Sequence, residues 1–175
     1  MHEFDKKAKS IRLFILDVDG ILTSGLIYYG AEGEALKGFH VHDGFGIKLL
    51  QQCGITLAVI SGRQSKLVTM RMKNLGIEHV FLGCDNKVPS YDTLKKQLQL
   101  NDHQIAYMGD DLPDLPIFKR VGLSVTVPEA PEIMRKHADF VTHKKAGFGA
   151  VREVCEMILK AQDQYQSVIQ SYLSQ

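Results

Sequence analysis

Short apolar runs recur along the chain and alternate with stretches whose apolar residues follow a helical spacing. Most of the runs are apolar on both faces, which is typical of strands in a parallel sheet covered by helices. We expect strands at residues 11–16, 55–61, 79–83, 104–109, 123–127 and 139–142. We expect helices at residues 44–53, 64–74, 88–99, 114–120, 130–137 and 149–162, the last of which can continue towards Leu173. This alternation predicts an α/β, Rossmann-like doubly wound sheet, in which ligands bind at the carboxyl ends of the strands.

One segment, residues 25–41, interrupts the alternation. Its centre reads AEGE, which is a turn signal, and the flanking residues are typical of two short antiparallel strands. Residues 26–29 are consecutively apolar or aromatic, whereas a hairpin in solvent alternates apolar and polar positions. We therefore expect a β-hairpin flap with apolar surface on both faces.

The length and charge of the chain limit its organisation and its partners. The 175 residues are sufficient for one domain, residues 1–175, which ends in a helix and tail at residues 149–175. A formal net charge of +1 gives no electrostatic case for a nucleic acid or a membrane surface as a partner. The start of the chain is polar, unlike a secretory signal, and no apolar run is long enough to cross a bilayer. Three cysteines without a CxxC pair fit the reducing cytoplasm.

Two aspartates, Asp17 and Asp19, follow the first apolar run. A carboxylate is costly to bury without a partner, and residues two apart in an extended segment point to the same side. Such a pair at the end of a strand suits nucleophilic and general acid–base roles. The sequence DVDG is also typical of an Asp-Gly turn, so this motif alone leaves both interpretations open.

A second acidic cluster, in the sequence YMGDDLPDL, contains Asp110, Asp111 and Asp114. Five carboxylates at two strand ends would repel one another unless a cation lay among them, and oxygen ligands favour Mg²⁺ over zinc. The alternative is structural: Asp111 or Asp114 can cap a helix that starts near Leu112, or Asp114 can bond to loop backbone.

Two further side chains lie where a phosphate would need them. Ser61 ends the second predicted strand ahead of a helix, and Lys87 follows the third strand. Taken singly, Ser61 fits a helix cap and Lys87 fits a solvated surface lysine. Together with the aspartates they form a series in sequence order: a nucleophile, a hydroxyl, a lysine and an acid, one in each strand–helix unit and each after its strand. This regular placement favours the functional interpretation.

The segments DVDGILT, SGR and GDDLPD, together with Lys87, resemble the haloacid dehalogenase-type phosphohydrolase superfamily. The resemblance implies that Asp17 attacks phosphorus and becomes an aspartyl phosphate. It implies that Asp19 protonates the leaving alkoxide and later deprotonates water. It implies that Mg²⁺ is held by the Asp17 side chain, the Asp19 backbone carbonyl and Asp110. The remaining implied roles are orientation of ligands or waters by Asp111 and Asp114, and binding of phosphoryl oxygens by Ser61 and Lys87.

The chain has no room for the cap domain that members with large substrates usually carry. GLIYYGAEGEALKGFHVHDGFGIKLL, SGR, GDDLPDLPIF and AGFGAVREV resemble the 3-deoxy-D-manno-octulosonate 8-phosphate phosphatase family, from about Ile11 to about Ile158. The resemblance implies hydrolysis of a sugar acid phosphate in lipopolysaccharide biosynthesis by a homotetramer whose hairpins pack together. Arg63 and Arg71 are eight apart on one predicted helix, close enough to share a face. The implied substrate contacts are Asp19, His40, Val41, His42, Asp43, Gly44, Lys48, Arg63, Arg71 and Lys87, with His40 to Gly44 as a loop.

The chain departs from the family pattern at two positions. His42 stands where we expect Arg or Lys, and Phe148 stands at an Arg position of the tail, where it offers an aromatic cover in place of a charge. A nonulosonate 9-phosphate is therefore a rival substrate. A receiver domain of two-component signalling also uses Mg²⁺, a phosphorylated Asp, a hydroxyl and a Lys. In that pattern, however, the acid pair ends the first strand and the phospho-acceptor comes later.

Overall fold

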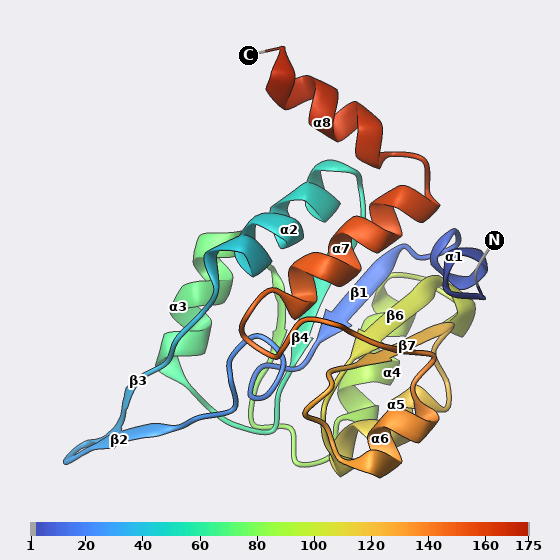
Figure 1. Ribbon diagram of the computed structural model, residues 1–175. Helices are drawn as coiled ribbons and strands as arrows, with labels where there is room; N and C mark the ends of the chain where they lie inside the picture. Colours follow the sequence, from blue (N-terminus) through green and yellow to red (C-terminus); the bar gives the residue numbers. More distant parts are fainter. Residues whose placement is uncertain (1–2, 175) are drawn as a thin grey trace.

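A computed structural model describes residues 3–174, so the predicted domain limits at residues 1 and 175 lie outside the described residues (Figure 1). Six parallel strands form one sheet in the order β5-β4-β1-β6-β7-β8. The strands are β1 (Leu13–Leu16), β4 (Thr56–Ile60), β5 (His79–Phe81), β6 (Ile105–Met108), β7 (Leu123–Thr126) and β8 (Phe140–Val141). Every residue of β1, β6 and β7 is buried, as the two-sided apolar pattern predicts. The α/β doubly wound fold is confirmed.

Helices cover both faces of the sheet (Figure 1). One layer contains α1 (Glu3–Ala8), α2 (Val41–Gln52), α3 (Lys66–Leu75) and α7 (Ala150–Ala161). The other contains α4 (Val88–Gln97), α5 (Leu115–Phe118) and α6 (Glu132–His137), with short 3-10 turns at Asp102–Gln104 and Leu112–Asp114. The buried residues of α7, which include Val151, Val154 and Ile158, recur at the spacing of one helix face. Within residues 3–174, no helix is long and apolar enough to cross a membrane.

The order in which the chain adds strands to the sheet reverses at β1. After β1 the chain builds β4 and β5 on one side, and it then crosses back through α4 to place β6 on the other side. The ladder between β1 and β6 continues past the strand ends, since Asp17 N donates to Met108 O at 2.9 Å. The carboxyl end of β1 is therefore the point where an open α/β sheet binds ligands.

The predicted flap is a two-stranded antiparallel sheet, β2 (Tyr28–Gly30) and β3 (Gly33–Leu36), separate from the main sheet. It projects from the body of the molecule beyond α3 (Figure 1). All three residues of β2 are exposed. The turn is possible because Gly33 has φ +113°, which favours a residue without a side chain.

Most predicted elements differ from the structure by one to three residues at an end, and three of these differences have a clear local reason or affect the predicted substrate loop. The helix expected at 44–53 begins at Val41, so most of the expected substrate loop is its first turn. The helix expected at 64–74 begins only at Lys66, because the Ser65 side chain accepts a hydrogen bond from Val68 N and caps it. The helix expected at 149–162 does not run on continuously. It ends at Ala161, and α8 (Tyr165–Leu173) starts after a turn in which Asp163 has φ +58°. The short helix α1 was not predicted.

Candidate active site

A cavity of about 310 Å³ opens at the carboxyl ends of the central strands. The polar residues predicted to act together converge on it from β1, β4, β6 and the segment after β5. Those that line the cavity are Asp17, Asp19, Ser61, Lys87, Asp110, Asp111 and Asp114. The chain therefore brings together the whole set of groups expected to perform the chemistry.

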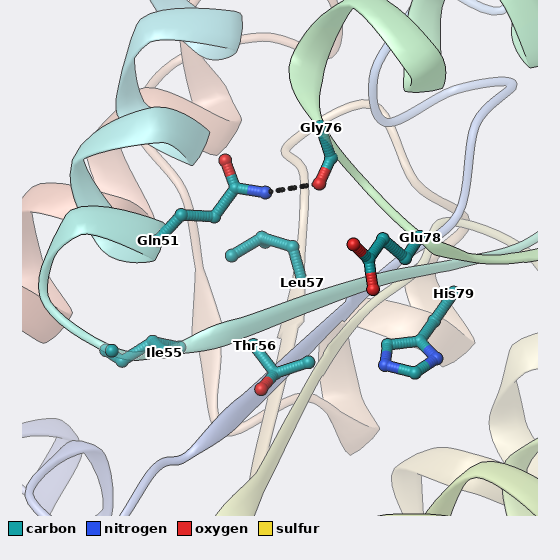
Figure 2. A pocket seen from close by; sticks show the side chains of 8 residues that line it. Gln51, Ile55, Thr56, Leu57, Gly76, Glu78 and His79 are labelled. Atoms are coloured by element: carbon teal, nitrogen blue, oxygen red, sulfur yellow. Dashed lines mark hydrogen bonds between the residues drawn. The ribbon is translucent and has the colours of Figure 1, made fainter.

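A second hollow of about 310 Å³ lies near the amino end of β4, at the other end of the strand (Figure 2). Gln51, Thr56, Glu78 and His79 supply its polar groups, and Gln51 Nε2 donates to the Gly76 carbonyl at 3.0 Å. This lining lacks a lysine and a carboxylate cluster. The hydrolytic chemistry expected from the sequence therefore belongs to the cavity at the carboxyl ends.

The Lys87 ammonium joins two of the aspartates. Its Nζ lies 3.0 Å from Asp17 Oδ1 and 2.6 Å from Asp114 Oδ1, and the Lys87 side chain is only 4% exposed. Burial alone lowers the pKa of this ammonium, but the charges of Asp17 and Asp114 outweigh that effect and raise its pKa. Lys87 is thus a permanently charged cation beside the Asp17 carboxylate, and it is not a solvated surface lysine.

Asp114 holds this arrangement together. Its Oδ1 also accepts from the Tyr107 hydroxyl at 2.6 Å, and its Oδ2 accepts from the backbone N–H groups of Asp110 and Asp111 at 3.1 and 3.3 Å. Burial and the neighbouring carboxylate charges raise the pKa of Tyr107, so its hydroxyl remains a donor. Four donors occupy Asp114. It therefore positions Lys87 and the loop after β6, and it has little capacity left for another ligand.

The acidic cluster fits a divalent cation. One oxygen from each of Asp17, Asp110 and Asp114 lies within 4.8 Å of the others. Asp17 Oδ1 is buried, and the Lys87 ammonium lies 3.0 Å from it. The Asp110 carboxylate is seated against Gly20, where a Cβ would lie only 2.1 Å from its Oδ2. Because Asp114 is occupied, Asp17 and Asp110 supply the available oxygens, and hard carboxylate oxygens suit Mg²⁺.

Burial raises the pKa of Asp17 to about 6, with Lys87 opposing and Asp114 adding to the shift. Burial, followed by the charges of Asp17 and Asp114, raises the pKa of Asp110 to about 8. The metal-free folded chain therefore binds more protons than the unfolded chain between the ordinary carboxyl pKa of 3.8 and the raised values of about 6 and about 8. The stability that these two groups contribute is lost as the pH rises through that range. Mg²⁺ binds the ionised carboxylates, so its stabilising effect grows over the same range.

We accordingly expect added Mg²⁺ to raise the melting temperature more at pH 8 than at pH 5.5, as measured by thermal unfolding. Asp110→Asn removes a carboxylate but keeps its shape, and it serves as the control. In this variant the increase caused by Mg²⁺ is expected to be small at both pH values. An equal increase for the wild type at both pH values would contradict the assignment of these carboxylates to the metal.

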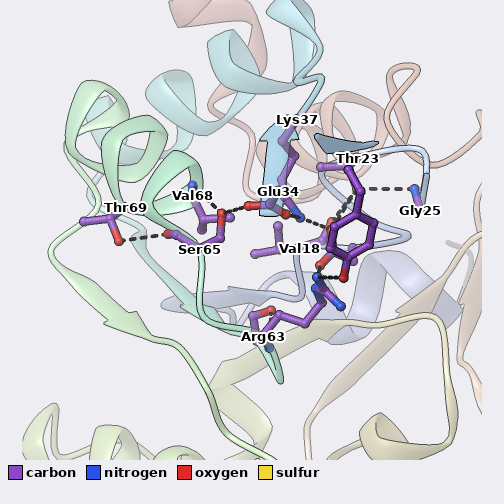
Figure 3. A network of polar contacts seen from close by, with 12 residues as sticks. Val18, Thr23, Gly25, Glu34, Lys37, Arg63, Ser65, Val68 and Thr69 are labelled. Carbon is purple, nitrogen blue, oxygen red and sulfur yellow. Dashed lines mark hydrogen bonds and ion pairs between the residues drawn. The ribbon is translucent and has the colours of Figure 1, made fainter. Parts of the chain in front are cut away.

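Two cations flank Asp19 (Figure 3). The Lys37 ammonium, at the foot of the flap, contacts Asp19 Oδ1, and Arg63 Nε lies 3.7 Å from Asp19 Oδ2. Arg63 Nη2 donates to the Tyr29 hydroxyl of the flap at 3.2 Å. Arg63 therefore lies beside the active-site aspartate, in the loop before α3, and does not share a helix face with Arg71 as predicted.

Ser61 and Asp111 have clear local roles. The Ser61 side chain is 3% exposed, and its hydroxyl oxygen accepts from Arg63 N at 3.4 Å, so its proton remains available to a ligand. Asp111 Oδ1 accepts from Leu112 N at 2.8 Å and caps the turn Leu112–Asp114. Asp111 is therefore a helix cap, as the structural alternative predicted. Asp114 bonds to loop backbone, as the other structural alternative predicted, and it also contacts Lys87.

Asp43 is one of the predicted substrate contacts that lie away from the cavity. It is 1% exposed, and its carboxylate accepts from Gly149 N at 3.2 Å and from Arg152 N at 2.8 Å. Gly149 precedes α7 and has no side chain to cap it, so Asp43 caps that helix from α2. The prediction that Asp43 belongs to an open substrate loop is therefore wrong for its side chain.

The other predicted contacts gather on the α2–α3 side of the molecule. Arg71 packs over the Phe39 ring, 5.8 Å from its centroid, and against Gly44, where a Cβ would lie 2.3 Å from its Nη2. His40 and His42 meet edge to face at 5.1 Å. None of these side chains lines the cavity, and neither do the exposed residues Val41 and Lys48.

Sequence reasoning missed Lys37, Glu34 and Tyr107. Tyr107 reads as one more large residue of a buried strand, and nothing in the sequence marks its hydroxyl as a partner of Asp114. Lys37 and Glu34 read as ordinary polar residues of a hairpin. Their one sequence signal is an acidic and a basic residue three apart on the second side of the hairpin.

Comparisons with known proteins identify the family. A sequence model of haloacid dehalogenase-like hydrolases matches residues 83–154. The 3-deoxy-D-manno-octulosonate 8-phosphate phosphatase KdsC of Salmonella typhi is 49% identical over 89% of this chain and 83% of that protein. The crystal structure of the Moraxella catarrhalis phosphatase in complex with magnesium ion, phosphate ion and KDO superposes with a TM-score of 0.95. It is 46% identical, over 98% of this chain and 99% of that chain.

The cobalt-bound deoxy-D-mannose-octulosonate 8-phosphate phosphatase (YrbI) from Haemophilus influenzae has a TM-score of 0.89 at 44% identity, over 91% of this chain and 93% of that chain. Identity at this level over most of the length of both proteins shows common family membership and not only a shared fold. The match to the family model includes the second acidic cluster, whose geometry in this chain is described above. The chain belongs to the 3-deoxy-D-manno-octulosonate 8-phosphate phosphatases, within the haloacid dehalogenase-like hydrolases.

Proposed function

We propose that this chain is a Mg²⁺-dependent phosphomonoesterase that hydrolyses 3-deoxy-D-manno-octulosonate 8-phosphate to the free sugar acid and phosphate, in lipopolysaccharide biosynthesis. The observation that carries the proposal is the Asp17 carboxylate 3.0 Å from the Lys87 ammonium, in a cavity shared with Asp19, Ser61 and Asp110. A phosphate monoester is anionic and repels a carboxylate nucleophile. A buried, permanently charged lysine beside the nucleophile offsets that repulsion.

The residue roles follow from this placement. Asp17 attacks phosphorus, the ester P–O bond breaks, and Asp19 gives its proton to the leaving alkoxide. Water then attacks the aspartyl phosphate and gives a proton to Asp19, which releases phosphate and restores the Asp17 carboxylate. Ser61 and Lys87 bind the phosphoryl oxygens, while Asp111 and Asp114 orient the loop after β6. The Asp17 and Asp110 side chains and the Asp19 carbonyl would hold Mg²⁺, which stabilises negative charge on the transferring group.

The proposed organisation is one domain over residues 1–175, with the flap at 25–41 and the terminal helices at 149–175, assembled as a homotetramer in the cytoplasm. Free cysteines at 53, 84 and 155 support a reducing compartment. The tetramer is supported by the exposed apolar side chains of the flap, since such patches mark interfaces and closed symmetry is the usual outcome. Those side chains are Leu26, Ile27, Tyr28, Tyr29 and Leu36. In such an assembly His40, His42, Lys48 and Arg71 would contact the sugar acid.

Phosphate release from a panel of esters tests the proposed function. We expect kcat/KM for 3-deoxy-D-manno-octulosonate 8-phosphate to exceed that for a nonulosonate 9-phosphate and for glucose 6-phosphate by about tenfold or more. Preference for the nonulosonate ester would assign the rival substrate. Phosphorylation that stops at one phosphate per chain, without turnover, would favour a receiver-type switch and contradict the enzyme.

A further inference from the structure

The lysine at the foot of the flap is held in a fixed position beside the active site. Lys37 directly follows β3, and its side chain is only 1% exposed. Its ammonium contacts Asp19 Oδ1 and lies 3.1 Å from Glu34 Oε1 (Figure 3). A buried ammonium is retained only where it is paired, so these two carboxylates account for its burial.

Glu34 is itself anchored to the body of the molecule. Its Oε2 accepts a hydrogen bond from the Ser65 hydroxyl, and the Ser65 side chain also caps α3 by accepting from Val68 N at 3.3 Å. The Ser65 hydrogen bond is the main reason why the pKa of Glu34 is lowered. Glu34 is therefore a fixed anion, and Lys37 is held between the flap strand and the start of a helix.

The two oxygens of Asp19 are held differently. Oδ1 contacts the Lys37 ammonium and accepts from the Thr23 hydroxyl at 3.4 Å. Oδ2 is buried and has no hydrogen-bond donor, since Arg63 Nε at 3.7 Å is within ion-pair distance only. One oxygen is thus anchored by two neighbours, and the other is left without a donor.

The positive charges around Asp19 are largely offset. Lys37 and Arg63 supply two positive charges, Glu34 supplies one negative charge, and Asp19 supplies a second when it is ionised. In the form that acts as the acid, Asp19 carries its proton on Oδ2 and is neutral. Because Glu34 shares the Lys37 ammonium, Lys37 fixes the direction of the Asp19 side chain without adding a net positive charge to the site. The contact therefore serves geometry, and a displacement of about 1 Å in a catalytic group is sufficient to cost a large factor in rate.

We propose that Lys37, seated by Glu34, is a positioning residue for Asp19: it holds Oδ1, so that Oδ2 is the oxygen that gives the proton to the leaving alkoxide. The inference rests on the proposed phosphatase function and deepens it. It gives the flap a role in the chemistry of its own chain, in addition to any contact with a neighbouring subunit. No bond to Lys37 forms or breaks in the reaction.

The test compares two leaving groups. Lys37→Met is expected to lower kcat by about tenfold to a hundredfold on the octulosonate ester, whose alkoxide needs a proton, with KM within about twofold of the wild type. On 4-nitrophenyl phosphate, whose phenolate leaves without a proton, the loss is expected to stay within about threefold. Asp19→Asn gives the same pattern with larger losses, and Glu34→Gln gives it with smaller ones. Lys37→Arg restores part of kcat, because it keeps the charge at the same place.

Matched controls are Lys96→Met and Glu32→Gln, which change exposed residues of the same types on α4 and on the flap turn. Both are expected to keep wild-type kinetics. Circular dichroism melting and light scattering show whether the Lys37 variants stay folded and assembled. Equal losses of kcat on both substrates, or wild-type kcat in a folded Lys37→Met, would overturn the inference.

The inference is separable from the proposed function. If the wild type hydrolyses a different alkyl phosphate, the octulosonate substrate is wrong. The loss of kcat in Lys37→Met on that ester, compared with its loss on 4-nitrophenyl phosphate, then still decides the role of Lys37. If the wild type hydrolyses 4-nitrophenyl phosphate and no alkyl phosphate, both proposals are wrong.

Discussion

Asp17→Asn is expected to lower kcat by about three orders of magnitude or more on every substrate, including 4-nitrophenyl phosphate. Asparagine keeps the shape of the side chain at the end of β1 but cannot form an acyl phosphate. The loss must be independent of the leaving group, because the attacking atom itself is removed. This pattern separates Asp17 from Asp19 and Lys37, for which the loss depends on the leaving group.

The Asp17 variant is also expected to fold normally. Asp17 is one of three carboxylates whose oxygens lie within 4.8 Å of one another, and Lys87 retains Asp114 as a partner at 2.6 Å. Removal of one charge therefore relieves repulsion in the metal-free chain. The measurements are steady-state kinetics and the metal-free melting temperature. Retention of more than about 5% of wild-type activity would exclude the covalent route, for which the nucleophile is indispensable.

Opposite charges placed on the flap are expected to separate the proposed tetramer into single chains. Tyr28 and Leu36 pair across β2 and β3 and are 46% and 53% exposed. The double substitution Tyr28→Glu and Leu36→Lys makes their common surface charged, while the two new charges attract each other and preserve the hairpin. Tyr29 is left unchanged, because its hydroxyl accepts from Arg63.

Light scattering at micromolar concentration checks the assembly, and kinetics check its consequence. We expect the separated chains to lose about tenfold or more in kcat/KM on the octulosonate ester, since the capless site lacks its neighbour. Activity on 4-nitrophenyl phosphate is expected to stay within about twofold, because the Asp17 and Asp19 chemistry lies within one chain. The conservative pair Tyr28→Phe and Leu36→Ile serves as the control and is expected to remain assembled. A wild type that is monomeric at micromolar concentration would contradict the proposal.

The sequence predicts the sheet and the main catalytic groups for a physical reason. Fully buried parallel strands require runs such as LFIL and IAYM, and the carboxyl ends of those strands share one edge. Polar residues that directly follow such runs must therefore converge. This rule brings Asp17, Ser61 and Asp110 to one cavity from the order of the residues alone, whereas Lys87 reaches the cavity from the loop between β5 and α4.

Features that depend on contacts between distant segments could not be predicted in this way. Asp43 reads as a loop residue, yet it caps α7, more than a hundred positions along the chain. Lys37 becomes buried only because Glu34 of β3 bonds to Ser65 at the start of α3 and the Lys37 ammonium contacts Asp19 after β1, which no local pattern specifies. The helix α1 has only six residues, too few to be stable alone, and it is held by Phe4, whose ring centroid lies 5.1 Å from that of Phe140.

The pairing of β1 with β6 has a consequence for how the enzyme is made. Leu13 of β1 pairs with Ile105 of β6. The ribosome therefore makes β4, β5 and their helices before it makes β6, the second neighbour of β1 in the sheet. During that interval the strand that ends at the nucleophile is an apolar sheet edge, and such edges invite pairing with other chains. Parallel pairing over this separation is also intrinsically slow. The catalytic centre therefore cannot be complete before β6 has been made, and a chain that stops before β6 is expected to be inactive and prone to aggregate.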